Sequence, residues 1–207
     1  MSKSMIFIRY LLIVIITLSF GHLVYAQENS QTIPSYNRNE WRHWIDSDND
    51  CQNLRQELLI SQSRTEVTYT NSRKCTVSTG NWIGPYTGKI FNKSSDIDVD
   101  HVVPLAYAHM AGGYLWTKSQ KEIFANDIEN LILVDDGENQ LKGAAGPSQY
   151  LPRESFRCDY LNIWGYIIKK YELQPLEKDQ ETINNYSNEC NIANETQGLI
   201  DNDIEQL

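Results

Sequence analysis

The stretch Ile97–Val103 alternates apolar and acidic side chains and ends at Pro104. Alternation with a period of two is typical of a half-buried β-strand, and proline ends a strand because it has no N–H for the ladder. The short apolar run Leu131–Val134 indicates a second, buried strand, and Asn139–Lys142 begins another helix or turn. The expected order is therefore strand, helical insertion, strand and helix, which predicts an α+β fold.

A polar residue stands at each junction of these elements. They are Asp100, His101, Asn130, Asn139 and Lys142. Hydrolysis of a phosphodiester needs a base to deprotonate water, an ion to stabilise the leaving oxygen and cations to bear the phosphate charge. Histidine suits the first role at neutral pH because its unperturbed pKa is about 6.5. A carboxylate and an amide oxygen suit a hard cation such as magnesium or manganese.

The Asp-His-x-x-Pro strand end, the Asn before LILV and the Asn-x-x-Lys that follows resemble the motif of HNH nucleases. The wider pattern is similar to a family of secreted HNH proteins related to the C-terminal domain of GmrSD restriction enzymes. The blocks that carry the resemblance are YNRNEWRHWIDSDNDCQNLRQELL, GNWIGPYTG, DVDHVVPLAYA, FANDIENLILV and NQLKGAAGPSQYLP. It implies a small ββα-metal core embedded in helices. It also implies an endonuclease that cuts DNA and leaves a 5′-phosphate, with RNA as an open second substrate.

The same resemblance implies a role for each polar residue. Asp100 and Asn139 would ligate the metal, and His101 would be the general base. Asn130 would orient the base or its loop, and Lys142 would approach a phosphate. Many HNH proteins have a final histidine where this chain has Asn139, so the nitrogen ligand is missing. The oxygen-rich site favours Mg²⁺, with Mn²⁺ as the alternative, over zinc or nickel.

Arg55 lies with Glu57 in the CQNLRQELL block. One interpretation is a buried Arg–Glu pair that belongs to the fold. The other is an arginine that reaches the scissile phosphate and offsets charge in the transition state. Both interpretations stay open. We interpret His43 and His109 as packing residues outside the chemistry.

Asp46, Asp48, Asp50 and Glu57 are spaced as in a calcium loop, with the glutamate at the twelfth position. Cys51 stands at the sixth position, where such loops have glycine. An acidic surface loop that leads into a helix is the alternative. Calcium is therefore expected only as an additional ion beside the catalytic metal.

Residues 1–26 have the composition of a signal peptide. Lys3 and Arg9 form a basic region before an apolar run at Tyr10–Phe20. Val24-Tyr25-Ala26 is a small-x-small cleavage pattern. The run is short for a membrane span, with an uncleaved anchor as the alternative. We expect a secreted protein, extracellular or periplasmic, that is monomeric and has no membrane contact after cleavage.

Four cysteines remain after this cleavage. An even number in an exported chain favours disulfides, and the lack of a C-x-x-C pair argues against a zinc–thiolate site. Three pairings are possible. We favour Cys51–Cys75 and Cys158–Cys190 because each closes a modest loop within one half of the chain.

The predicted boundaries are a flexible leader at 27–38, a nuclease domain at 39–175 and an acidic tail at 176–207 that is partly tethered through Cys190. Local patterns add further expectations within the domain. They are helices at 52–61 and 159–172, strands at 67–70 and 74–77, a Gly/Pro loop at 80–88, and helical pieces over 105–128 broken at Gly112-Gly113 with Ser119 as an N-cap.

Charge counts against broad capture of nucleic acid. Without residues 1–26 the chain has 16 lysine and arginine residues and 27 acidic ones, a net charge of −11. Such a protein binds a polyanion poorly unless metal and a local cationic patch neutralise the phosphates. The alternative function is a non-catalytic extracellular protein that binds calcium or a cell-surface partner on a degenerate nuclease scaffold. The joint presence of Asp100, His101, Asn130 and Asn139 argues against it.

Overall fold

A computed structural model describes residues 32–190. The expected signal peptide, the first part of the expected leader and residues 191–207 lie outside the described residues. The chain divides into the units Met1–Thr32 and Ile33–Leu207. Within residues 32–190, no helix is both long and apolar enough to cross a membrane.

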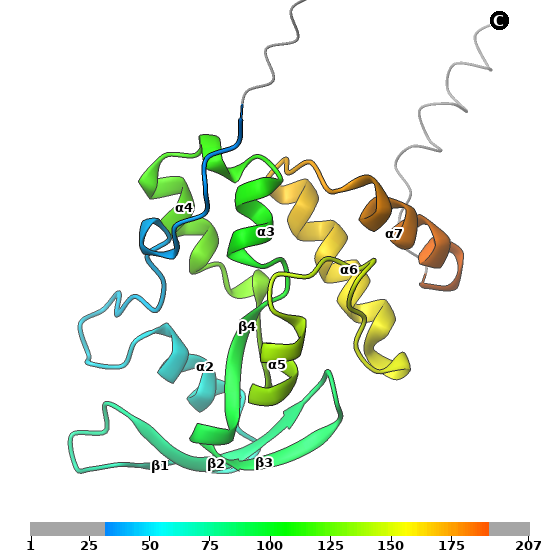
Figure 1. Ribbon diagram of the computed structural model, residues 1–207. Coiled ribbons are helices and arrows are strands. Elements are labelled where there is room, and N and C mark those ends of the chain that lie inside the picture. The colour runs from blue at the N-terminus through cyan, green and yellow to red at the C-terminus, as the bar shows by residue number, and fades with distance from the viewer. Residues whose placement is uncertain (1–31, 191–207) are drawn as a thin grey trace, which may run out of the picture. The chain divides into compact units, whose positions relative to one another are not determined.

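Five strands and six α-helices make up the described part of the chain (Figure 1). The strands are β1 (Thr68–Tyr69), β2 (Val77–Gly84), β3 (Lys89–Lys93), β4 (Ile97–His101) and β5 (Leu131–Asp135). The helices are α2 (Leu54–Ser61), α3 (Leu105–Met110), α4 (Lys118–Ala125), α5 (Asp136–Lys142), α6 (Glu154–Lys170) and α7 (Glu177–Cys190). Short 3-10 turns are η1 (Arg38–Glu40), η2 (Ser94–Asp96), η3 (Gly113–Leu115) and η4 (Ile128–Asn130). The predicted α+β class is confirmed.

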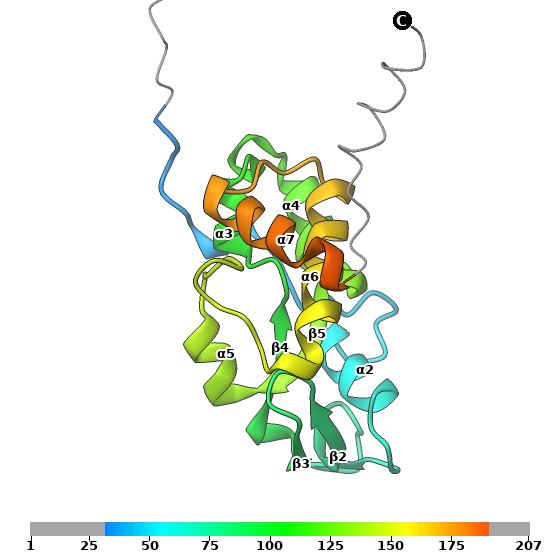
Figure 2. The same cartoon turned by 90° about the vertical axis from the view of Figure 1, so that its right-hand side faces the viewer.

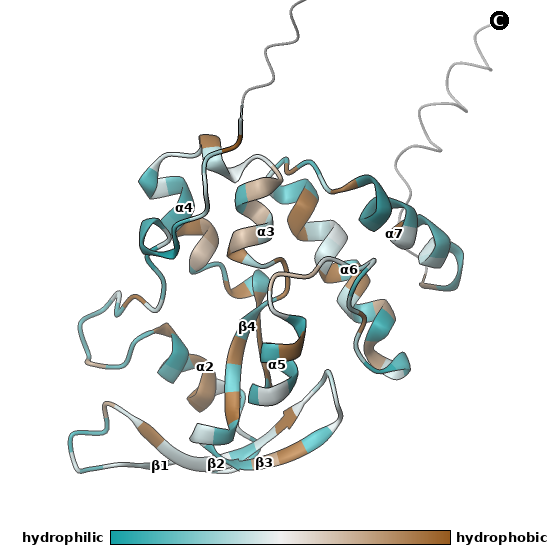
Figure 3. Ribbon diagram, in the orientation of Figure 1, coloured by the Kyte–Doolittle hydropathy of each residue, from teal (hydrophilic) through white to brown (hydrophobic). Residues whose placement is uncertain are grey.

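The two strands predicted from hydrophobic pattern form an antiparallel pair. β4 runs beside β5 from Ile97 opposite Asp135 to His101 opposite Leu131. The alternation of apolar and polar residues along β4 is visible in Figure 3. The apolar side chains of this strand are buried because they face the core that the strand shares with sheet β1-β2-β3.

β5 leads directly into α5, which completes the expected order of strand, insertion, strand and helix. The Asp135 side chain caps the helix by accepting a hydrogen bond from the backbone N–H of Glu138 at 3.1 Å. Gly143 ends it at φ +52°, a backbone conformation that favours glycine. α5 therefore lies against β4 and carries its polar residues to the same place as the end of that strand (Figure 1).

The second sheet has the antiparallel order β1-β2-β3, and α2 packs against it. The indole N–H of Trp82 in β2 donates to the backbone carbonyl of Leu59 in α2 at 2.8 Å. Both residues belong to a buried cluster that also includes Ile97 and Leu133 from the β4–β5 pair. The two sheets thus share one small core.

The Gly/Pro loop expected at 80–88 is wrong for its first half. Residues up to Gly84 belong to β2, and only Pro85–Gly88 make the turn into β3, with Gly88 at φ +77°. At Gly80 a Cβ atom would lie 2.6 Å from the Trp82 ring. Glycine at this position therefore makes room for the indole inside a strand and does not mark a loop.

The helical insertion breaks where the sequence predicts it. Gly112, at φ +122°, separates α3 from η3. The expected N-cap at Ser119 is wrong, because Thr117 caps α4. Its side chain accepts from the backbone N–H of Gln120, and the Gln120 side chain accepts from the backbone N–H of Thr117.

Beyond the boundary expected at residue 175, α7 packs along α6 (Figure 2). Asp179 at its start is buried with 1% exposure. It accepts hydrogen bonds from the Tyr107 hydroxyl at 2.7 Å and from the backbone N–H of Ser148 at 2.8 Å. A buried carboxylate with these partners fixes the helix to α3 and to the loop before α6.

The last residues of the expected leader are likewise ordered. The carbonyl of Pro34 lies 2.8 Å from Nε2 of His109, and the ring of Tyr36 packs against Trp41 and His109. His109 therefore has the packing role predicted for it. Residues 34–38 belong to the folded domain because buried aromatic side chains hold them.

Both predicted disulfides are confirmed. Cys51–Cys75 joins the loop before α2 to the β1–β2 turn, and Cys158–Cys190 joins α6 to the end of α7. No cysteine is free among the described residues.

Replacing Cys158 and Cys190 together by serine should lower the free energy of unfolding by about 2–4 kcal/mol, since the bridge restricts the unfolded chain over a separation of 32 residues. Urea unfolding followed by circular dichroism measures the change. A loss below about 0.5 kcal/mol would show that the packing of Ile183 and the bonds of Asp179 hold α7 without the bridge.

Candidate active site

The residues expected to carry chemistry meet at the C-terminal end of β4. An open pocket with a volume of about 330 Å³ is lined there by Asp100 and His101 from β4 and by Asn139 from α5. Arg38 from η1 also lines it. The pairing of β4 with β5 and the direct start of α5 explain how residues 39 positions apart reach one pocket.

His101 is buried, with 6% exposure, at the last position of β4. Its Nε2 lies 2.9 Å from the backbone carbonyl oxygen of Ala125 at the end of α4. A carbonyl only accepts, so Nε2 holds the proton of the neutral ring and Nδ1 holds the free lone pair. Nδ1 has no hydrogen-bond partner among the described residues. The ring is therefore oriented as a base whose acceptor nitrogen is available.

Burial lowers the pKa of His101 to about 3, and the backbone carbonyl of Ala125 opposes this shift. The positive charges of Arg38, His43 and Lys142 lower the pKa further. The imidazole is therefore neutral at physiological pH and accepts a proton without first losing one.

An aromatic and basic segment next to the pocket was missed by the sequence prediction. Trp44 stacks on the His101 ring with centroids 5.6 Å apart and planes at 29°, and the His43 ring lies 6.5 Å away. Nη2 of Arg38 lies 3.3 Å from Nε2 of His43, whose Nδ1 is 2.8 Å from the carbonyl of Trp41. The signal was the dense run of aromatic and basic residues in YNRNEWRHW, which stands out in an acidic chain.

Asp100 is held by two neighbours inside the protein. Its Oδ2 accepts a hydrogen bond from the Tyr86 hydroxyl at 2.8 Å and lies 2.9 Å from the ammonium of Lys142. Oδ1 accepts from the same ammonium at 3.1 Å. Burial raises the pKa of Asp100, while Lys142 and Tyr86 lower it and so favour the carboxylate.

Lys142 is not where the resemblance to HNH proteins suggests. Its side chain has 0% exposure, and its ammonium contacts Asp100 and the backbone carbonyl of His101 at 2.9 Å. The expectation that Lys142 approaches a phosphate is therefore corrected. The residue lies on the inner side of α5, where it joins the helix to the end of β4.

The donor atoms fit a hard divalent cation. A carboxylate has about four lone-pair positions, and the contacts of Asp100 use three of them. The Nδ2 of Asn139 donates to Asp98 Oδ2 at 3.0 Å, which leaves the Asn139 amide oxygen free for a ligand. Oxygen donors without a thiolate match magnesium or manganese.

Asn130 lies beneath the pocket with 0% exposure. Its Oδ1 accepts from the backbone N–H of Val103 at 2.8 Å, and its Nδ2 donates to the carbonyl of Val103 at 3.1 Å. Its own carbonyl accepts from the N–H of Val102 at 2.9 Å. These three bonds fix the two residues that follow His101 in the chain.

Arg55 is not part of this pocket. Its Nη2 donates to the carbonyls of Ser94 and Ile97 at 2.9 and 3.0 Å, and the residue lines a different pocket beside β2 and β3. The expectation that it reaches the scissile phosphate at His101 is corrected by this position. The Arg55–Glu57 pair, considered as an alternative, is also absent among the ion pairs of the described residues.

The carboxylates of Asp46, Asp48 and Asp50 gather in the loop before α2, with one oxygen of each within 4.8 Å of the others. Cys51 at the sixth position has φ +78°, the conformation for which calcium loops have glycine. The carboxylates already accept backbone hydrogen bonds of the loop, such as that from Cys51 to Asp46 at 3.0 Å. Calcium binding here stays a prediction, with Glu57 outside the cluster.

The depressed pKa of His101 predicts how stability depends on pH. The unfolded chain binds a proton near pH 6.5 and the folded chain only near pH 3, so the free energy of unfolding falls as pH is lowered through this range. From pH 7 to pH 5 His101 should account for about 2 kcal/mol of this loss. Urea unfolding in chelator measures it, and His101→Gln should lose correspondingly less. Equal losses in both proteins would contradict the buried neutral imidazole.

Comparison with known proteins agrees with this geometry. Residues 53–185 match the family described as GmrSD restriction endonucleases, C-terminal domain. The chain is also 35% identical over 158 residues to an uncharacterized secreted protein of Arthroderma benhamiae, which covers 75% of this chain and 76% of that protein. No solved structure matches the chain.

The relative supports the predicted location, since it is named as secreted and two disulfide bridges are typical of an exported protein. The matched region includes β4, β5 and α5, which carry the pocket. This chain therefore belongs to the family of the C-terminal domain of GmrSD restriction endonucleases.

Proposed function

We propose that this protein is a secreted, metal-dependent endonuclease that hydrolyses phosphodiester bonds of DNA, with RNA as a second substrate to be tested. The observation that carries the proposal is the orientation of His101. Its Nε2 is tied to the carbonyl of Ala125, while Nδ1 is free in a pocket that also contains Asp100 and Asn139. Family membership supports the nuclease class.

His101 would act as the general base on water. The water oxygen attacks phosphorus while Nδ1 takes its proton, the P–O3′ bond breaks, and the leaving oxygen takes a proton from solvent. The products are a 5′-phosphate and a 3′-hydroxyl. The carbonyl of Ala125 stabilises the imidazolium that forms because it accepts from Nε2.

A pKa of about 3 makes His101 a weak base in the free protein. A bound phosphodiester brings a negative charge next to the ring, and this charge raises the pKa by favouring the imidazolium. The substrate therefore strengthens the base that acts on it. Arg38, exposed at the rim, has the charge to bind a phosphate oxygen at the same time.

Asp100 and Asn139 would hold the divalent cation through one carboxylate and one amide oxygen. When bound, the cation supplies electrostatic stabilisation for the leaving oxygen and the phosphate. Lys142 and Tyr86 oppose the rise in the pKa of Asp100 that burial causes, and they fix the direction of its carboxyl group. Asp98 orients Asn139, because it accepts from Nδ2 and so turns the amide oxygen away from itself.

The other candidate is a non-catalytic protein that binds calcium or a cell-surface partner. The cluster of Asp46, Asp48 and Asp50 is the observation that favours it. Nicking of a supercoiled plasmid with and without chelator separates the two functions. Cleavage that stops in chelator supports the nuclease, and a protein that never cuts supports the alternative.

His101→Ala should lower the cleavage rate at least about 100-fold, the scale expected for loss of a general base. Added imidazole should restore part of the rate, because a small base fills the space that the side chain leaves. Steady-state cleavage of one duplex measures both effects, and thermal unfolding shows that the variant is folded. Full activity, or a loss that imidazole cannot restore in a folded variant, would remove His101 from the role of base.

Asn139→Ala should abolish the stimulation by magnesium, since it removes one of the two side-chain oxygens of the site. The double variant Asp98→Asn with Asn139→Asp is the matched control, because it keeps an oxygen at position 139 and an amide donor to hold it, and it should retain the stimulation. Asp100→Ala is a poorer test, because it would leave Lys142 buried without its partner. A magnesium titration of cleavage decides; an unchanged response of Asn139→Ala would show that the ligands are misassigned.

A further inference from the structure

One segment of this acidic protein has a net positive charge. Residues 61–95, which contain β1, β2 and β3, have five lysine and arginine residues and one glutamate. The other described residues, 32–60 and 96–190, have eleven basic and twenty-one acidic residues. Of the five, only Lys89 forms an ion pair among the described residues, with Asp135 at 3.4 Å. The local charge is therefore largely unneutralised.

An open pocket of about 450 Å³ lies on this sheet. Two cations line it, Lys93 at the end of β3 and Arg55 from α2, together with hydroxyl side chains of β2 and η2. No carboxylate is among the described residues that line it. Lys93 is exposed and stands directly opposite Thr79 on β2.

Several donors of this pocket have no partner within the described protein. Arg55 uses only Nη2, on the carbonyls of Ser94 and Ile97, so its Nε and Nη1 hydrogens stay available. The hydroxyls of Thr76 and Ser78 also have no partner among the described residues. A partly buried guanidinium, a lysine and free hydroxyls are the groups that bind phosphate oxygens.

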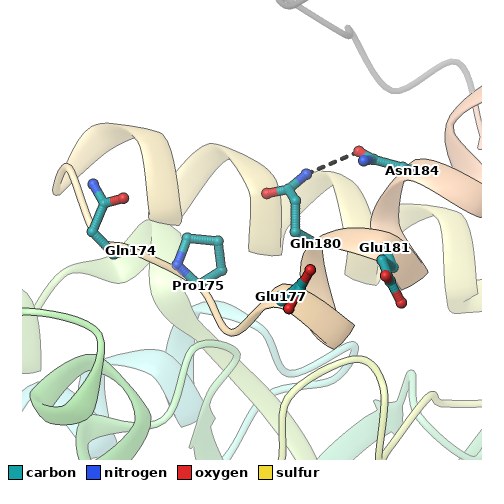
Figure 4. A pocket seen from close by; sticks show the side chains of 6 residues that line it. All are labelled: Gln174, Pro175, Glu177, Gln180, Glu181 and Asn184. Carbon is teal, nitrogen blue, oxygen red and sulfur yellow. Dashed lines mark hydrogen bonds between the residues drawn. The ribbon is translucent and has the colours of Figure 1, made fainter.

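The pocket on α7 shows how unusual this composition is for the chain. It is lined by Gln174, Glu177, Gln180, Glu181 and Asn184, together with a proline (Figure 4). The amide of Gln180 already donates to Asn184 at 2.9 Å. The two glutamates repel a polyanion. The pocket on α7 and the pocket on sheet β1-β2-β3 therefore differ in the sign of their charge.

We propose that the pocket on sheet β1-β2-β3 binds the sugar–phosphate backbone of duplex DNA on one side of the bond that is cut. This inference rests on the proposed function. Arg55 contacts Ile97, the first residue of β4, and His101 is the last. Four strand steps of about 3.3 Å separate the two by roughly 13 Å, or about four nucleotides at 3.4 Å each. A DNA strand that follows β4 would span this separation.

The test is equilibrium binding of a fluorescein-labelled duplex, long enough to span both pockets, measured by anisotropy in chelator so that nothing is cleaved. Lys93→Ala should raise Kd about 3–10-fold at low salt. Between about 50 and 200 mM salt it should reduce the slope of log K against log salt by about one, because one phosphate contact is lost. Thr76→Asp should weaken binding more, because it places a carboxylate in the pocket.

Lys178→Ala is the matched control, an exposed lysine on α7 beside the acidic pocket, and its Kd should equal that of the wild type. Wild-type affinity in Lys93→Ala and Thr76→Asp, or equal weakening in Lys178→Ala, would overturn the inference. Binding of the wild-type protein to heparin without binding to DNA would also overturn the inference. Single-stranded DNA and duplex RNA as competitors identify the preferred backbone.

This inference and the proposed nuclease function fail separately. If binding depends on Lys93 but plasmid is never cut, the binding surface stands and the proposed function falls. If plasmid is cut and binding is insensitive to both pocket variants, the nuclease stands and the surface falls.

Discussion

The buried ion pair between Asp100 and Lys142 is the interaction on which the rest of the site depends. It joins the end of β4 to the end of α5, with the Lys142 side chain fully buried and that of Asp100 6% exposed at the pocket. Removal of one partner from such a pair typically costs about 3–5 kcal/mol, because the other charge is left buried. The ammonium also binds the carbonyl of His101, so the proposed metal ligand and the proposed base are held by one cation.

This arrangement shows how an acidic chain would support the proposed chemistry on a polyanion. Lys142 neutralises the charge of Asp100 within the protein, so the pocket does not repel a phosphate as a bare carboxylate would. Arg38 adds positive charge at the rim, and sheet β1-β2-β3 adds more at the other end of β4. The net charge of the whole chain says little about the potential at these two places.

The sequence predicts the elements whose pattern is local. The alternation in β4, the apolar run of β5 and the even set of cysteines each gave a confirmed strand or bridge. Glycine misled at Gly80, where the reason for glycine is a tryptophan ring packed above the strand. The acidic composition after residue 175 predicts a tail outside the domain. It does not show that Asp179 is buried, because its partner Tyr107 comes from α3, far away in the sequence.

The same limit holds for the site. Asp100, His101 and Asn139 follow from motif spacing, since β4, β5 and α5 are consecutive units with short connections. Arg38 and Trp44 come from a segment about 60 residues earlier, and only tertiary packing brings them to His101. The orientation of the Lys142 side chain could not be predicted from the sequence either. A lysine on a short helix faces solvent or the core according to the residues that pack against the helix.

Asn130 closes the segment between β4 and β5 into a loop-like insertion that leaves and returns at one point of the fold. Its bonds to Val102 and Val103 close that segment at its base, next to the pairing of His101 with Leu131. Insertions or deletions near Gly112 should therefore leave β4 and β5 in register, because the bonds of Asn130 do not involve the residues around Gly112. The exception is the returning end of the insertion, where Ala125 must still present its carbonyl to His101. Length changes are thus tolerated best around Gly112, while α3, whose Tyr107 donates to Asp179, and the exit of α4 are constrained.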